Sequence, residues 1–148
     1  MTRAACLFML ALFMPTIAQA QSPQTVMDTF EEQLHTDGPE RAIATLFDSN
    51  PWLRANEDVK ASISGQLENL LPRVGAYHRN ERMGSTQVSE SFVFYTYLYL
   101  YDRQPLRFHF TFYRPAETWM LFNFSFNDSF SDEFEEAHRL YQIAHPIP

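Results

Sequence analysis

A histidine stands in the middle of a strand-like run of alternating aromatic and polar residues. His109 is flanked at every second position by Arg107, Thr111 and Tyr113. A lone histidine in such a setting is more typical of a hydrogen-bonded interface residue than of a catalyst, because no nucleophile accompanies it at a recognisable spacing. We therefore predict that His109 belongs to a binding surface.

Two neighbouring runs add residues of the same kind. Side chains alternate faces along a strand, so the odd-numbered residues of all three runs are predicted to share one face. A surface of rings with hydrogen-bonding tips is partly apolar and partly wet, and suits a partner or a ligand. The residues that we predict to form this ligand or interface face are Tyr95, Tyr97, Tyr99, Arg107, His109, Tyr113 and Asn123. A homodimer interface or cover by a C-terminal helix is the simplest interpretation; a site for an aromatic, lipid-like or glycan ligand, or catalysis, is an alternative.

Other combinations of reactive residues lack the spacing that their chemistry needs. Ser125 and the acidic residues form neither a triad pattern nor a nucleophile elbow, and the chain has only four glycines and no phosphate loop. Glu135, His138 and His145 could share one side of a helix, but a metal site needs more converging ligands. We predict no catalytic residue, no metal ligand and no cofactor.

Three strand-like runs, at 92–101, 106–113 and 119–126, are expected to form an antiparallel meander. Their even-numbered residues are apolar with the exception of Thr96, and we expect them to pack against helices, unless a bulge shifts the parity. These residues are Phe92, Phe94, Leu98, Leu100, Leu106, Phe108, Phe110, Phe112, Met120, Phe122, Phe124 and Phe126.

Helices are expected before and after the sheet. Ser22-Pro23 begins the first helix, which ends near Gly38; a second covers about 39–48, and a third follows Asn56 and ends at Pro72 to Gly75. A weaker strand is predicted from 76 to 83, with a turn at 84–86, and a last helix at about 131–144. The fold class is α+β: N-terminal helices packed on a curved four-stranded antiparallel meander, plus a C-terminal helix.

The first twenty residues are typical of a secretory signal peptide. Arg3 precedes an apolar stretch, and Ala18-Gln-Ala20 predicts cleavage after Ala20. Cleavage removes Cys6, the only cysteine, and leaves a single domain at 21–148 with no transmembrane segment. The chain has a net charge of −7, which argues against nucleic-acid binding. We predict a periplasmic or secreted protein.

The order of elements and three motifs resemble the NTF2-like superfamily, the cystatin-like α+β cones. The motifs are Phe108-x-Phe-x-Phe-Tyr-Arg-Pro115, Trp119-x-Leu and Asn123-Phe-Ser-Phe-Asn-Asp128. The resemblance implies a cone whose interior, in enzymes of this type, joins a carboxylate or histidine to a tyrosine. Only Tyr77, His78 or Glu81 of the first strand could supply such groups here.

These observations together predict an exported, non-catalytic binding or assembly module that associates through its tyrosine-rich face. Its partner would be a second copy or another exported protein. The alternative is a periplasmic protein that binds a small hydrophobic or aromatic molecule, or a glycan. A cone-pocket enzyme of the isomerase or dehydratase type is the remaining alternative.

Overall fold

The computed structural model describes residues 21–129 and 131–145, and it confirms the α+β fold class. The predicted signal peptide, residues 1–20, lies outside the described residues. Three helices come first, a four-stranded sheet follows, and a helix ends the chain. Their bounds are α1 Pro23–Thr36, α2 Pro39–Asp48, α3 Glu57–Val74, β1 Tyr77–Ser89, β2 Phe92–Tyr101, β3 Leu106–Tyr113, β4 Met120–Asn127 and α4 Ser131–Ala144.

The starts and ends of the helices follow from local chemistry. The Ser22 hydroxyl accepts a hydrogen bond from the Thr25 amide at 3.1 Å, and Pro23 occupies the first turn of α1. Gly38 has a φ of 94°, which a glycine adopts without strain, and it separates α1 from α2. Gly75 ends α3 at a φ of 95°, where a Cβ would lie 2.7 Å from the Cβ of Asp102. These two glycines allow the sharp changes of direction between elements.

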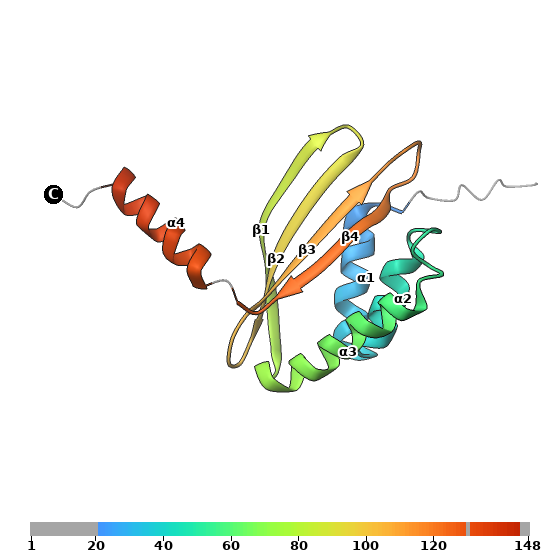
Figure 1. Cartoon of the computed structure of the whole chain (residues 1–148), viewed down its shortest axis with the longest axis horizontal. Coiled ribbons are helices and arrows are strands. Elements are labelled where there is room, and N and C mark those ends of the chain that lie inside the picture. Colours follow the sequence, from blue (N-terminus) through green and yellow to red (C-terminus); the bar gives the residue numbers. More distant parts are fainter. Residues whose placement is uncertain (1–20, 130, 146–148) are drawn as a thin grey trace, which may run out of the picture.

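The sheet is an antiparallel meander in the order β1-β2-β3-β4. The predicted turn at 84–86 is wrong, because β1 continues to Ser89 and the turn falls at Glu90 and Ser91. Gly84 lies at a register shift between β1 and β2, where a bulge bends the strand without ending it. The β1–β2 hairpin therefore extends beyond the helices (Figure 1).

Helices α1 to α3 cover one face of the sheet, which we call the helix side; the opposite face is the open side (Figure 1). Phe30 of α1 is fully buried, and its ring centroid lies 5.2–5.9 Å from those of Phe108, Phe110 and Phe124. Edge-to-face contacts of this kind fill space efficiently between a helix and a sheet. The core of the protein is this aromatic layer.

Helix α4 projects from the end of β4, on the side of the sheet away from α1 to α3 (Figure 1). Three of its apolar side chains are largely exposed: Leu140, Tyr141 and Ile143. In the described part of the chain, no helix combines the length and the apolar character needed to cross a membrane.

Candidate functional site

The register between β2 and β3 separates the residues that were predicted to share one face. Tyr95 pairs with Phe110, Tyr97 with Phe108 and Tyr99 with Leu106. Paired residues of antiparallel strands point to the same side of a sheet, so odd positions of β2 lie with even positions of β3. The prediction that all odd-numbered residues share a face is wrong, because the turn between β2 and β3 sets a pairing of opposite parity.

The tyrosines of β2 belong to the helix side. Tyr99 is 2% exposed, and its ring centroid lies 4.4 Å from that of Phe108. Tyr97 is also buried, and its hydroxyl reaches the side-chain oxygen of Gln24 on α1 at 3.4 Å. Tyr95 is partly buried against the same core. These three residues are therefore part of the core rather than of a free surface.

The other four predicted site residues lie on the open side. Of these four residues, Arg107 is buried, His109 is partly exposed and Asn123 is exposed. Thr111, which lies between His109 and Tyr113 on the same side, is also buried. His109 pairs with Thr96 across the strands, with Nδ1 3.0 Å from the Thr96 hydroxyl. Tyr113 pairs with Phe92 and Met120. Arg107, His109, Tyr113 and Asn123 thus share the open side, without the tyrosines of β2.

The even-numbered residues of β2 were expected in the core and instead face the open side. Phe92, Phe94, Tyr113 and Phe122 form a group that we call the open-face aromatic cluster. The Phe92 ring centroid lies 5.1–5.8 Å from those of the other three rings. Phe94 is 41% exposed and Phe122 is 56% exposed. The cluster is an apolar surface of the sheet that α1 to α3 leave uncovered.

A bulge in β4 brings Phe122 into this cluster. Thr111 pairs with Asn123 and Phe112 with Leu121, so Phe122 has no opposite partner. The shift turns Leu121 into the core, where it is fully buried. Phe122 was expected on the helix side, and the extra residue of the bulge is the reason that it is not.

An apolar groove continues the cluster around the edge strand β4. It has a volume of about 420 Å³ and is lined by Asn50, Trp52, Leu53, Tyr113, Pro115, Met120 and Phe122. The side-chain nitrogen of Asn50 donates a hydrogen bond to the Leu121 carbonyl at 2.7 Å. The side-chain oxygen of Asn50 accepts one from the backbone amide of Trp52 at 2.9 Å. Buried Asn50 therefore holds the loop after α2 against the bulge, and Trp52 remains 81% exposed beside it.

A second cluster, on the helix side, joins a carboxylate and a histidine to three tyrosines. Tyr77 donates a hydrogen bond to Glu31, and its ring stacks on that of His35 with centroids 3.7 Å apart. Tyr99 and Tyr101 complete the group. Sequence reasoning allowed Tyr77 to point inward but missed Glu31 and His35; their spacing of four, beside the buried Phe30 and Leu34, was the available signal.

The surroundings of this cluster favour the neutral forms of its histidine and its tyrosines. Burial lowers the pKa of His35 below 6.5, although the nearby charge of Glu31 acts to raise it. Burial also raises the pKa of Tyr99 and Tyr101, and the pKa of Tyr77 rises through burial and its hydrogen bond to Glu31. Because the stacked rings are in direct contact, no space for a substrate lies between them. The group acts as a polar part of the core.

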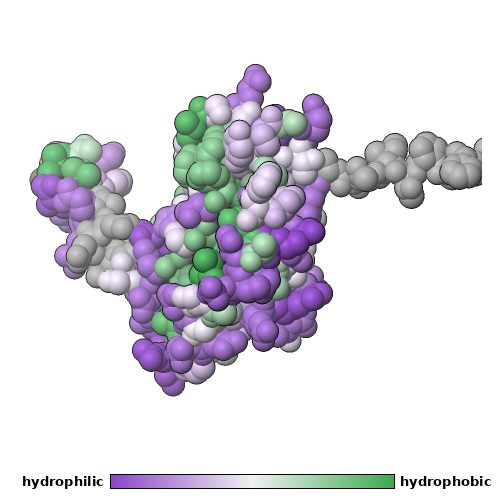
Figure 2. All heavy atoms as spheres, turned by 45° about the vertical axis from the view of Figure 1, so that its right-hand side comes forward, coloured by the Kyte–Doolittle hydropathy of each residue, from purple (hydrophilic) through white to green (hydrophobic). Residues whose placement is uncertain are grey.

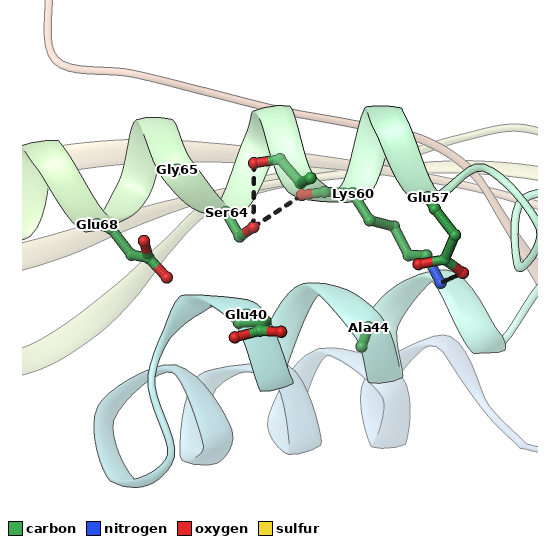
Figure 3. A pocket seen from close by; sticks show the side chains of 8 residues that line it. Glu40, Ala44, Glu57, Lys60, Ser64, Gly65 and Glu68 are labelled. Atoms are coloured by element: carbon green, nitrogen blue, oxygen red, sulfur yellow. Dashed lines mark hydrogen bonds and ion pairs between the residues drawn. The ribbon is translucent and has the colours of Figure 1, made fainter.

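A surface groove between α2 and α3 collects charged residues (Figure 3). It measures about 270 Å³ and includes Glu40, Glu57, Lys60, Ser64 and Glu68. Lys60 pairs with Glu57 at 2.6 Å, and the Ser64 hydroxyl donates to carbonyls of its own helix at 2.9 and 3.2 Å. The groove therefore presents carboxylates to solvent, but neither an activated nucleophile nor a free lysine.

Of Glu135, His138 and His145, the three residues considered as metal ligands, both histidines have other partners. His138 Nε2 lies 2.9 Å from the Gln142 side-chain nitrogen, and His145 stacks on Tyr141 with ring centroids 4.4 Å apart. Within residues 21–129 and 131–145, no group of three or more His, Cys, Asp or Glu side chains is placed to hold a metal ion.

No family model, curated protein or solved structure matches this chain. The function must therefore be argued from the open-face aromatic cluster and the groove beside it.

Proposed function

We propose that the protein is an exported assembly module that forms a homodimer through the open side of its sheet. The observation that carries this proposal is the open-face aromatic cluster, in which Phe94 and Phe122 are about half exposed. Aromatic residues are enriched in the cores of protein interfaces, and charged residues are depleted there. On the open side, charges are confined to β1 and to the end of the sheet near Arg107.

A homodimer is favoured over a catalytic role by the distribution of titratable groups. The carboxylate–histidine–tyrosine cluster lies on the helix side and is closed by stacked rings. The open side offers rings, hydroxyls and amides, which recognise a surface more readily than they transfer a proton. We therefore propose that the open side binds a partner rather than catalyses a reaction.

The NTF2-like type and the export of the chain belong to the same proposal. Three helices on one face of a bent four-stranded meander support the superfamily assignment, which rests on the motifs of the sequence. Arg3, the apolar stretch and Ala18-Gln-Ala20 support export to the periplasm or the medium. An aromatic core accounts for how a chain without disulfides would remain folded there.

The oligomeric state tests this proposal. Light scattering of the purified protein, between low and high micromolar concentration, should show a dimer that dissociates on dilution. Phe94→Glu should give a monomer at all these concentrations, because it places a charge in the interface. Val59→Glu, at an exposed apolar position of α3 that is 46% exposed, is the matched control and should remain dimeric. A monomeric wild-type protein at high micromolar concentration would refute the proposal.

The groove beside Trp52 supports a second candidate function, the binding of a small hydrophobic or aromatic molecule. Its volume of about 420 Å³ is in the range of small-molecule sites, and most of its lining is apolar. A fluorescent naphthalene sulfonate should bind the wild-type protein and lose its binding in Trp52→Ala, without a change in unfolding free energy. Equal binding by both proteins would exclude this groove as the site.

A further inference from the structure

We propose that the outer edge of β4 binds an extended segment of a partner protein, which adds to the sheet as a fifth strand. β4 is the last strand of the sheet, and no strand within residues 21–129 and 131–145 pairs with its outer edge. The backbone donors and acceptors of such an edge are a template for another extended chain. This binding site is separate from the homodimer proposed above, which uses the open side.

The register of the sheet shows which backbone groups face this edge. The Arg114 amide donates to the Ser91 carbonyl at 2.9 Å, so the even-numbered residues of β3 exchange hydrogen bonds with β2. In antiparallel strands, bonded pairs alternate with pairs that turn their N–H and C=O groups away from each other. The odd-numbered residues of β3 therefore bond to β4. Phe124 and Phe126 lie between the bonded positions of β4 and direct their backbone groups outward.

The first part of this edge is already closed by the chain itself. Leu121 pairs with an even-numbered residue of β3, so its backbone groups also face outward. Its amide donates to the Ser49 hydroxyl at 3.4 Å, and its carbonyl accepts from the Asn50 side chain at 2.7 Å. The loop after α2 thus takes the place of a neighbouring strand at Leu121. The edge is left for a partner at Phe124 and Phe126.

The opposite edge of the sheet is protected against strand addition, whereas this part of β4 is not. β1 carries Arg79, Glu81 and Arg82, and it has three register shifts against β2. Charges and bulges on an edge strand oppose the addition of another strand. β4 contains no charged residue from Met120 to Asn127, and its pairing with β3 is regular after the bulge. The difference selects β4 as the edge that accepts a partner.

A groove between α3 and the edge of β4 can receive side chains of the added strand. It consists of two adjoining hollows, of about 180 and 350 Å³, which share Gln66 and Phe126. Ile63 and Phe124 line the smaller hollow, and the larger one includes Leu70 but is otherwise mostly polar. On the body of the molecule in Figure 2, hydrophobic atoms reach the surface between hydrophilic side chains. Backbone groups and side-chain pockets therefore occur along the same few residues.

This geometry defines the kind of segment that fits. Alternate side chains of a strand point to one face and lie about 7 Å apart, as Phe124 and Phe126 do on β4. The segment should place an apolar side chain beside Ile63 and, two positions away, a polar one beside Arg73. Proline is excluded where the segment donates to β4. The β4 of a second copy lacks such side chains, because its own Phe124 and Phe126 pack in its core.

Selection of random linear peptides displayed on phage, against the full purified protein, tests this inference. The enriched sequences should share an apolar residue and a polar residue two positions away, without proline at the pairing positions. A synthetic peptide of the most enriched sequence should slow hydrogen exchange of the Phe124 and Phe126 amides, measured by NMR. The amides of Asn123 and Ser125 should not change, because they already bond to β3.

Two lysine variants, one turn apart on α3, locate the site. Ile63→Lys should weaken binding of the synthetic peptide at least about tenfold, which corresponds to about 1.4 kcal/mol, because it places a charge in the groove. Val59→Lys, outside the groove on the same helix, should bind the peptide as the wild-type protein does. Phe94→Glu should also bind it equally, since the open side takes no part.

Each failure has its own meaning. If no peptide is enriched, or if Ile63→Lys binds the peptide as well as the wild-type protein does, the inference is refuted. Loss of peptide binding in Phe94→Glu would place the peptide on the open side and would also refute it. If the Phe124 and Phe126 amides become protected as the concentration of the protein alone rises, the edge pairs with a second copy instead. None of these results decides the homodimer, which light scattering tests separately.

Discussion

The two sides of this sheet are built from the same residue types and have opposite surroundings. On the helix side, Phe108, Phe110 and Phe112 are fully buried beneath α1 to α3. On the open side, Phe94 and Phe122 remain about half exposed. Aromatic content alone therefore does not distinguish a core from a binding surface. The difference comes from which side the helices cover, and three predictions test that difference.

The largest expected effect is a difference in stability between the two sides. Phe110→Ala should lower the free energy of unfolding by about 3–5 kcal/mol, because it leaves a cavity in a filled core. Phe94→Ala should lower that of the monomer by only about 1 kcal/mol, since the ring is already partly in water. Urea unfolding at a protein concentration below the dissociation constant of the dimer measures both values. Equal losses would mean that the two sides are not different environments.

The next effect concerns the junction between the two sides. Asn50→Ala removes the buried bonds that hold the Trp52 loop against the bulge of β4, and should cost about 1–3 kcal/mol. Asn56→Ala is the control: Asn56 is exposed and makes no capping bond with its side chain. Thermal unfolding should separate the two variants. Similar midpoints for both would show that Asn50 does not secure this loop.

The smallest effect is the contribution of His35, on the helix side, to the pH dependence of stability. His35 faces Glu31 of its own helix, Tyr77 of β1, and Tyr99 and Tyr101 of β2. Its folded-state pKa lies below 6.5, so below pH 6.5 the unfolded chain binds more protons than the native protein. The contribution of neutral His35 to the free energy of unfolding is therefore fully present above pH 6.5. It is lost as the pH falls through the folded-state pKa of His35.

The comparison of two variants isolates this contribution. The unfolding free energy of His35→Gln should depend less on pH below 6.5 than that of the wild-type protein. His138→Gln, at an exposed position of α4, should keep the wild-type dependence. If His35→Gln also keeps it, the histidine is not held neutral by the tyrosine cluster.

Local patterns were sufficient to predict the elements. Alternation of large apolar residues located β2, β3 and β4, and caps such as Ser22 located the helices. The strand β1 was predicted too short, because Gly84 resembles a turn residue and marks a bulge instead. The final helix at Ser131–Ala144 was predicted within its observed bounds.

The faces could not be predicted in the same way, because both sides of the strands are apolar. Hydrophobic alternation specifies register only where one face is polar. Tyr97 and Phe94 are equally plausible as core residues, and the turn after Tyr101 decides between them. The strand β3, with Arg107 and His109 on one side and Phe108 and Phe110 on the other, was polar enough on one side to be oriented correctly, and so was the end of β4 from Asn123 to Phe126. The contact between His35 and Tyr77 depends on how α1 packs against the sheet. The only local signal for it in the sequence is the spacing of Glu31 and His35.

Hydroxyl-radical footprinting tests most directly the claim that the open side, and not the tyrosine side, is the association surface. At low protein concentration, Phe94 and Phe122 should be oxidised, and at high concentration both should become protected. Tyr97 and Tyr99 should resist oxidation at every concentration, since they are buried within one chain. Oxidation of Tyr97 and Tyr99 at low concentration, or unchanged oxidation of Phe94 at high concentration, would contradict the account.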